Sequence, residues 1–358
     1  MYLSQLIKRS TLRLALVVPN LFVLAACAPV STPVSAPAQE VAVPTAADRG
    51  TLVVYSGRSE NLVGPLIEQF EAAMSIAVKT RYGSTSEMAA TILEEGQNSP
   101  ADVFFGQDAG ALGALAKEGR LAPLAEETLA LVETPYRSAQ GTWVGASGRA
   151  RVLAYNINAV SEADLPADIH GLTDPQWKGR VAWAPPNGSF QSFMTALRLL
   201  EGEDAARQWL LDMIANDVQA YENNDAIMQA VADGEVDLGL VNHYYLYAFK
   251  AEQGEDFPVA NYFFPNPGAG SIVNVAGAGV VDTAAHKNEA AQFVAWLLSE
   301  QAQNYFATQT NEYPLATGVA VVPALKPLAE IAHPDIDLSN LDDLQGTLTL
   351  LQETGAIQ

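Results

Sequence analysis

The chain has 358 residues with 41 acidic and 19 basic side chains, which gives a formal net charge of −22. This excess of acid argues against nucleic-acid binding, because contacts to backbone phosphates need clustered Lys and Arg. A single cysteine excludes a disulfide within the chain. The folded part, expected from residue 49 onward, is too long for one ordinary core and favours two lobes.

Residues 1–26 predict a signal peptide. Lys8, Arg9 and Arg13 precede an apolar run over residues 14–26, which is shorter than the roughly 20 residues of a transmembrane helix. The run ends Leu-Ala-Ala-Cys at Cys27, which resembles a bacterial lipoprotein box. We therefore expect lipid on Cys27 and anchoring at the outer face of the cytoplasmic membrane or in the periplasm. An ordinary small residue near a cleavage site is the alternative for Cys27.

Residues 27–48 predict a lipid-anchored linker. The segment is rich in Pro and Ala and contains little else than Ser, Thr, Val and Gln, a composition typical of a semi-extended spacer. Such a spacer lets a folded module reach a partner in the membrane while it hangs from its anchor.

The first part of the folded region alternates strands and helices. Strands are expected at residues 51–56, 76–82 and 102–105, and helices at 62–75, 86–95 and 109–118. This alternation predicts an α/β sheet, and open α/β sheets bind ligands beyond the carboxyl ends of their strands. The loops at 56–59, 82–85 and 106–108 are therefore candidates for ligand contact.

Two extended, glycine-interrupted stretches, at residues 143–158 and 270–282, predict connections between two lobes. Between them we expect a strand at 181–183 and helices at 190–201, 203–215 and 225–234. Two such connections are typical of a hinged two-lobe binder. The predicted division is an N-lobe of residues 49–148 plus about 276–310, a C-lobe of residues 149–275, and a C-terminal segment, 311–358, whose lobe the pattern leaves open.

Tyr244 and Tyr245 are the most informative residues. They follow a short apolar strand expected at residues 237–241 and begin a helix expected at 244–254, with Asn242 as its N-cap. Side chains one residue apart on a helix diverge by about 100°, so both phenols can converge on one ion. Because a phenol has a pKa of about 10, binding at neutral pH points to a hard, acidic cation such as Fe(III). The alternative is the buried aromatic stripe of an amphipathic helix.

Several short motifs occur in a fixed order along the chain. They are Val-Tyr-Ser-Gly-Arg at 54–58, Pro-Ala-Asp-Val-Phe at 100–104, Trp-Val-Gly-Ala-Ser-Gly-Arg at 143–149, Asn-Gly-Ser-Phe at 187–190, Asn-His-Tyr-Tyr at 242–245, Pro-Gly-Ala at 267–269 and Glu-Tyr-Pro at 312–314. With these motifs the chain resembles the periplasmic ferric-iron-binding subunits of ABC transporters, within the extracellular solute-binding protein class. The resemblance implies a two-lobed α/β periplasmic-binding-protein fold of type II, with hinged lobes and a ligand cleft between them.

The resemblance also implies a set of ligands. Vicinal tyrosines bind ferric iron in that family, which implies this role for Tyr244 and Tyr245, and Tyr155 is similar to the third phenolate of members that use three. A synergistic anion, carbonate (bicarbonate) or phosphate, completes the family's site. The residues that match its contacts are Asn187, Gly188, Ser189, Asn224 and Asn242. The Asn-Gly-Ser run precedes the helix expected at 190–201, where free backbone N–H groups favour an anion; a plain turn and helix cap is the alternative.

The chain departs from some relatives in its N-lobe, where Ser59 and Gln107 stand in place of a histidine and a glutamate. It therefore resembles the subgroup that uses tyrosines plus an exogenous anion. Arg58 and Ser59 are expected to contact that anion, because carbonate added to Fe(III) and three phenolates leaves negative charge that the Arg58 guanidinium can balance. A surface arginine without a role is the alternative for Arg58.

The predicted function is therefore a monomeric, lipid-anchored receptor that captures Fe(III) with an anion and hands it to an ABC permease with its ATPase, without catalysis. A receptor of the same fold for a small anion, such as a phosphonate, sulfate or organic acid, is the alternative. An acyl-transfer enzyme using Ser59 or Ser189 is a third hypothesis, although no histidine lies in a matching loop. His243 is expected to be a helix-end residue.

Overall fold

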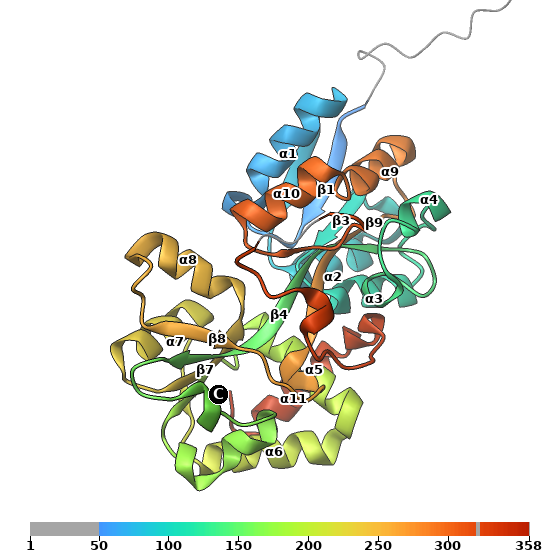
Figure 1. Ribbon diagram of the computed structural model, residues 1–358. Coiled ribbons are helices and arrows are strands. Elements are labelled where there is room, and N and C mark those ends of the chain that lie inside the picture. The colour runs from blue at the N-terminus through green and yellow to red at the C-terminus, as the bar shows by residue number, and fades with distance from the viewer. Residues whose placement is uncertain (1–49, 320–322, 358) are drawn as a thin grey trace, which may run out of the picture. The chain divides into compact units, whose positions relative to one another are not determined.

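The computed structural model describes residues 50–319 and 323–357 (Figure 1). The strands are β1 (Leu52–Ser56), β2 (Val78–Tyr82), β3 (Val103–Gly106), β4 (Val144–Asn156), β5 (Val181–Trp183), β6 (Gln219–Ala220), β7 (Leu238–Asn242), β8 (Val259–Tyr262), β9 (Val273–Val280) and β10 (Tyr313–Pro314). The helices are α1 (Glu60–Met74), α2 (Thr85–Glu95), α3 (Ala109–Lys117), α4 (Glu126–Leu129), α5 (Gly188–Glu201), α6 (Glu203–Ala215), α7 (Asn224–Asp233), α8 (Tyr244–Gln253), α9 (Lys287–Trp296), α10 (Glu300–Gln309) and α11 (Leu344–Thr354). The predicted signal peptide, the linker and Cys27 lie outside the described residues.

The long strand β4 joins two groups of elements. The sheet order is β2-β1-β3-β9-β4-β7-β5-β6, and β8 and β10 also pair with β4. The first part of β4, up to Ala150, pairs with β9 and β10, whereas the part from Arg151 onward pairs with β7 and β8. We call the strands β1–β3, β9 and β10 with their helices the first lobe, and β5–β8 with α5–α8 the second lobe (Figure 1). The predicted two-lobed α/β architecture is confirmed.

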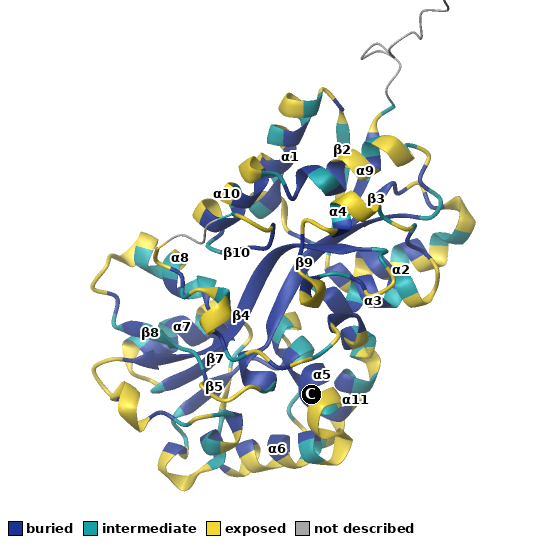
Figure 2. Cartoon of the chain, turned by 45° about the vertical axis from the view of Figure 1, so that its right-hand side comes forward, coloured by how far each residue is buried: buried dark blue, intermediate teal, exposed yellow. Residues whose placement is uncertain are grey.

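Burial explains why these segments fold as they do. All thirteen residues of β4 are buried, as expected for a strand covered on both faces (Figure 2). Helix α1 buries Val63, Leu66, Ile67 and Phe70, which recur at helical spacing and face the core of the first lobe. Phe70 meets Phe293 of α9 edge to face, with ring centroids 4.9 Å apart. The packed sheet thereby gives a fixed platform to the loops at its strand ends.

The return connection leads into β9 and overlaps the stretch that the sequence predicts for it, residues 270–282. Strand β9 belongs wholly to the first lobe, where it pairs with β3 and with the first part of β4, so residues 263–272 carry the chain back. The glycines of β9 serve close packing. A Cβ at Gly277 would lie 2.5 Å from the Val144 carbonyl oxygen, and one at Gly279 would lie 2.9 Å from that of Thr142.

The C-terminal segment contacts both lobes. The short 3₁₀ helix η9 (Leu338–Asp342) packs against α3 of the first lobe, and α11 packs against α5 and α6 of the second. The segment whose lobe the sequence left open is therefore a further link between the lobes. Over residues 50–319 and 323–357, no helix combines the length and the hydropathy that crossing a membrane requires.

Candidate functional site

A pocket of about 810 Å³ lies between the first and the second lobe. Its walls come from one side of α2, α3 and α5, from β4, from the start of α8 and from the C-terminal segment. Among the residues that line it are Gln107, Asp108, Arg149, Asn187, Gly188, Ser189, Tyr244 and Tyr245. A much smaller pocket, of about 10 Å³, shares Arg149 and Ser189 with it and also touches Arg151 and Asn242. The strand-end loops expected from the sequence therefore do meet.

Tyr244 and Tyr245 form the first turn of α8. Strand β7 ends at Asn242, and His243 is the N-cap of α8, one residue later than predicted. The two phenol rings stack, with centroids 4.5 Å apart and planes 28° apart. Burial raises the pKa of Tyr245, and the neighbouring Tyr244 and Asp225 raise it further, whereas the side chain of Asn224 opposes them. Deprotonation of Tyr245 at neutral pH thus needs a bound cation to offset the cost.

His243 fixes this turn in place. Its buried ring accepts a hydrogen bond from Ala150 N at Nδ1 (3.1 Å) and donates from Nε2 to the Asn311 carbonyl (2.9 Å). Burial lowers the pKa of His243 to about 4, so the ring is neutral at physiological pH. Because backbone groups occupy both ring nitrogens, His243 is a helix-end residue, as the sequence predicts, and its ring offers no free nitrogen to a ligand.

The N-terminus of α5 gathers the predicted anion contacts. Asn187 caps the helix, and its Oδ1 accepts hydrogen bonds from Ser189 N (2.9 Å) and Ser189 Oγ (2.6 Å). Asn224 donates from Nδ2 to Ser189 Oγ at 3.2 Å. Within the described part of the chain, the buried Oδ1 of Asn224 has no hydrogen-bond partner. Asn242 lines the small pocket beside Ser189, so the structure brings the five residues Asn187, Gly188, Ser189, Asn224 and Asn242 to one place.

Arg149 and Arg151 are pocket residues that the sequence reasoning missed. They stand two residues apart on β4 and therefore share a face. Arg151 is 1% exposed and donates from Nη1 to Ser189 Oγ (3.3 Å) and from Nη2 to the Leu240 carbonyl (3.1 Å). Burial lowers the pKa of Arg151 to about 9, while Tyr245 and Tyr244 raise it. Among the described residues, no carboxylate lies within 4.0 Å of its guanidinium.

A signal for the two arginines was present in the sequence. The run Gly148-Arg149-Ala150-Arg151-Val152 places two cations inside a segment that was predicted to be extended and is otherwise small or apolar. Charged residues at such positions are buried only when something compensates for their charge. The buried charge of Arg149 is partly compensated inside the protein. Its Nη2 donates to the Gln107 carbonyl, and its Nε lies 3.9 Å from Glu312 Oε1.

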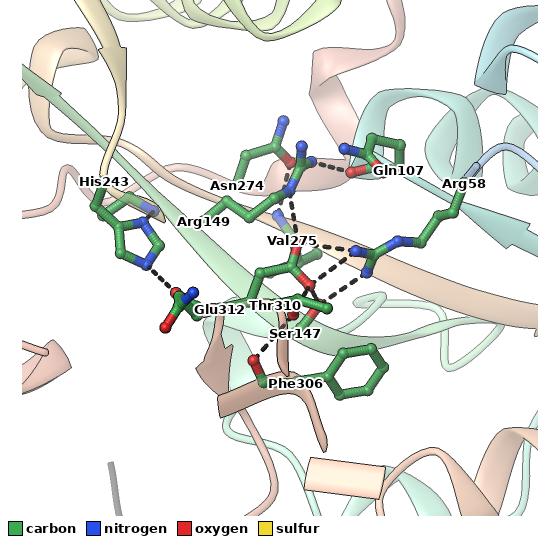
Figure 3. A network of polar contacts seen from close by, with 12 residues as sticks. Arg58, Gln107, Ser147, Arg149, His243, Asn274, Val275, Phe306, Thr310 and Glu312 are labelled. Carbon is green, nitrogen blue, oxygen red and sulfur yellow. Dashed lines mark hydrogen bonds and ion pairs between the residues drawn. The ribbon is translucent and has the colours of Figure 1, made fainter. Parts of the chain in front are cut away.

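Arg58 does not take the role predicted for it. Its guanidinium is fully buried and donates from Nη2 to both Glu312 oxygens (3.0 and 2.8 Å) and from Nη1 to Ser147 Oγ (3.1 Å), as Figure 3 shows. Arg58 does not line the pocket. The correction has an electrostatic reason, because a buried carboxylate from the neighbourhood of β10 already neutralises this cation. Ser59 is exposed before α1 and is likewise absent from the pocket lining.

Tyr155 is also separated from the tyrosine pair. On β4, Arg151 is opposite Asn242 of β7, and Tyr155 is opposite Leu238 at the other end of that strand. Four residues of strand span about 13 Å. The Tyr155 hydroxyl instead donates to Glu162 Oε2 at 3.4 Å. Both positions belong to one sheet of the second lobe, so closure of the lobes cannot bring them together, and the expectation of Tyr155 as a third phenolate is corrected.

The geometry offers oxygen donors for one hard cation and a positively charged binding site for one anion. Tyr244 and Tyr245 supply the phenol oxygens, and Arg151 with the N-terminus of α5 forms the anion site. Over the described ranges, no three His, Cys, Asp or Glu side chains cluster as a metal-binding group. The donor set is therefore one for a hard ion such as Fe(III), and it differs from the Cys and His sets of zinc sites.

Comparison with known proteins agrees with this architecture. The family model described as bacterial extracellular solute-binding protein matches residues 98–340. A Serratia marcescens protein named Fe(3+)-binding periplasmic protein is 35% identical over 313 residues, which are 87% of this chain and 92% of the relative. The crystal structure of iron-bound HitA from Pseudomonas aeruginosa has 39% identity and a TM-score of 0.80, and it covers 85% of this chain and 99% of its own.

A second solved structure, a Trichodesmium protein in complex with iron and citrate, has 31% identity and a TM-score of 0.76, with 86% of this chain and 99% of that chain covered. The two-lobed fold is thus that of type II periplasmic binding proteins. The family model spans more than half of the sequence, and the relatives span nearly all of the described chain. The protein therefore belongs to the bacterial extracellular solute-binding protein family.

Proposed function

We propose that this protein captures Fe(III) together with a small anion and delivers it to an ABC-type importer. The observation that carries the proposal is that the stacked Tyr244 and Tyr245 line a pocket that adjoins the small pocket of the buried Arg151, with Ser189 at the α5 N-terminus lining both. The Serratia Fe(3+)-binding periplasmic protein and the iron-bound HitA of Pseudomonas aeruginosa support the same metal.

Charge counting supports an anion beside the metal. Fe(III) with two phenolates carries one net positive charge, and the Arg151 guanidinium adds a second. A divalent anion such as carbonate or monohydrogen phosphate would neutralise this group, and the free N–H groups at the start of α5 would bind its oxygens. Arg58 and Glu312 cancel each other, so Arg149, which also lines the pocket, adds a further positive charge that favours an anion there. In this scheme Asn187, Gly188, Ser189, Asn224 and Asn242 surround the anion, and Tyr244 and Tyr245 bind the metal.

Transport follows from the hinge. Because β4 runs without interruption from one lobe to the other, a bend where its partners change, near Ala150, would close the lobes over the pocket. Closure removes water and strengthens the interaction of the ion with its ligands. A permease with its ATPase would distinguish the closed, loaded form from the open one. In this proposal the chain works as a monomer, without catalysis, and is tethered through lipid on Cys27.

Titration of the metal-free mature chain with ferric nitrilotriacetate tests the proposal. Visible absorbance is recorded first in bicarbonate and then in phosphate. We expect a phenolate-to-iron charge-transfer band that saturates at one iron per chain, and its dependence on the buffer identifies the anion. Absence of the band in both buffers would contradict iron binding. If calorimetry then detected binding of the anion without iron, the protein would be a small-anion receptor in which the buried Arg151 binds the anion.

A further inference from the structure

The pocket is lined by both polar and apolar side chains. The polar lining includes Arg149, Ser189 and the two tyrosines described above, and also Asp342 and Gln345 of the C-terminal segment. Three helices each contribute two apolar side chains three or four residues apart, which places them on one face. These residues are Ala90 and Leu93 of α2, Ala111 and Ala114 of α3, and Leu344 and Leu348 of α11, and we call this apolar part of the lining the vestibule.

Two walls of the vestibule are joined by direct backbone packing. A Cβ at Gly110 would lie 2.4 Å from the Leu341 carbonyl oxygen, and one at Gly113 would lie 2.1 Å from that of Ser339. Only glycine permits η9 to approach α3 so closely. Since η9 leads directly into α11, this contact sets α11 beside α3. The α3 and α11 walls are therefore held by packing inside the chain itself.

The size and the lining of the pocket exceed what an ion with an inorganic anion requires. A volume of about 810 Å³ falls in the range of organic-ligand sites, roughly 300–1,000 Å³. A small inorganic anion displaces the volume of only a few waters, at about 30 Å³ each. In addition, the Leu93 side chain is 40% exposed, and Leu344 and Leu348 are only partly buried. Apolar side chains that face a pocket gain free energy when a ligand excludes water from them.

We propose that the vestibule is a subsite for the hydrocarbon or aromatic body of an organic iron chelator, so that the cargo enters as a ferric chelate. This inference rests on the proposed function. The oxygen donors of the chelator would stay on the iron near Tyr244 and Tyr245 and face the two arginines. Its carbon skeleton would contact Leu93 and Ala114 on the first lobe and Leu348 on the α11 wall.

The test compares two ferric probes on the metal-free mature chain. One is iron in bicarbonate, which has no organic body, and the other is the ferric complex of salicylate, a phenol-carboxylate with an aromatic ring. Native mass spectrometry counts salicylate retained per iron, and competition with nitrilotriacetate gives the relative iron affinity. We expect one salicylate per bound iron and an affinity at least tenfold above that in bicarbonate.

Two variants alter two different walls of the vestibule. Ala114→Phe fills the vestibule and should weaken binding of the salicylate complex at least tenfold while iron binding in bicarbonate stays unchanged. Leu348→Ser removes an apolar contact from the α11 wall and should act in the same direction, which covers the case that the larger side chain impairs folding. Ala73→Phe, at an exposed position of α1 outside the pocket, adds the same bulk and should change neither measurement.

The results that would overturn this inference differ from those that would overturn the proposed function. Retention of no salicylate by the wild-type chain, with a normal charge-transfer band in bicarbonate, would refute the vestibule as a chelator subsite and leave the iron site standing. An equal loss for both probes in Ala114→Phe and Leu348→Ser would show that these residues serve only the contact between closing lobes. Absence of iron binding with either probe in the wild type would remove the proposed function itself.

Discussion

Asp342 and Asp343 are neighbours in the chain, yet their carboxylates pair with opposite lobes. Asp342 Oδ1 lies 2.6 Å from Lys117 Nζ on α3, and Asp343 Oδ2 lies 2.8 Å from Arg198 Nη2 on α5. The C-terminal segment is thus a third link between the lobes, after β4 and residues 263–272. Because this segment also lines the pocket, opening of the lobes must either strain this junction or carry α11 along with one lobe.

The close contact between α3 and η9 predicts that Gly113→Ala is destabilising. The added methyl would lie 2.1 Å from the Ser339 carbonyl oxygen, 2.8 Å from its carbon and 3.0 Å from its Cα, all of which are backbone atoms. Relief requires a shift of the C-terminal segment, and such overpacking costs about 1–3 kcal/mol. Urea unfolding of the metal-free protein measures the loss.

Gly64→Ala is the matched control for that substitution. Gly64 also lies inside a helix, α1, but a Cβ there meets its first neighbour only at 3.5 Å. The helix propensity of alanine should therefore stabilise this variant by about 0.5–1 kcal/mol. A Gly113→Ala protein as stable as this control would contradict the proposed packing of η9 on α3.

The Arg58–Glu312 pair predicts a large loss of stability when one partner is removed. Arg58→Met would leave the Glu312 carboxylate buried beside Ser147 and Thr310 without its main cation, which costs about 3–5 kcal/mol. The double variant Arg58→Met/Glu312→Leu should recover much of that loss, because both charges are gone. It should also bind one iron per chain. A double variant that is stable but binds no anion-dependent iron would restore the anion role first predicted for Arg58.

The Glu312 carboxylate also predicts that the free energy of unfolding falls at acidic pH. Burial alone would raise the pKa of Glu312, but the charges of Arg58 and Arg149 and hydrogen bonds from Arg58 and Ser147 hold it below its usual range. An unfolded glutamate has a pKa of about 4.3. The stabilisation is therefore fully present above that value and is lost as the pH falls towards the pKa of the folded state. Unfolding free energies of wild type and Glu312→Gln between pH 6 and 3 should converge as the pH falls.

Substitution of single tyrosines by phenylalanine should distinguish the tyrosines that bind iron from those that do not. Tyr244→Phe and Tyr245→Phe should each keep the fold, lose intensity in the charge-transfer band and bind iron at least tenfold more weakly, because each removes a phenolate. Tyr155→Phe should match the wild type, since its hydroxyl faces Glu162 at the far end of β7. Iron titrations of the three variants decide the point, and wild-type iron affinity in Tyr245→Phe would refute its role.

Removal of the Arg151 charge should stabilise the metal-free protein and weaken its binding of iron. The metal-free protein holds this cation buried at a pKa of about 9 with no carboxylate beside it among the described residues, so Arg151→Met should raise the free energy of unfolding by about 1–3 kcal/mol. The variant lacks the positive charge that binds the anion, so iron affinity in bicarbonate should fall by about tenfold or more. Arg151→Lys keeps the charge and should lose less affinity. Lower stability in Arg151→Met would show that its hydrogen bonds to Ser189 and Leu240 outweigh the cost of burying the charge.

Local patterns determined much of this protein. The alternation of strands and helices, the two-lobed plan and the strand-to-helix turn that carries Tyr244 and Tyr245 follow from hydrophobic periodicity, which acts over a few neighbouring positions. The exact N-cap of that turn did not, because it is His243 and not Asn242. The Asn-Gly-Ser run at the start of α5 was recognisable for the same reason, because a helix N-terminus is built from adjacent residues. These features needed no knowledge of distant contacts.

The tertiary structure decided which charges meet. Arg58 and Glu312 are 254 positions apart, and only the pairing of β10 with β4 reveals that they neutralise each other and that Arg151 is left beside the tyrosines. The strand register likewise separates Tyr155 from Asn242, although both stand near the ends of predicted strands. Electrostatic partners and strand registers depend on distances through space, and a sequence without its fold does not specify those distances.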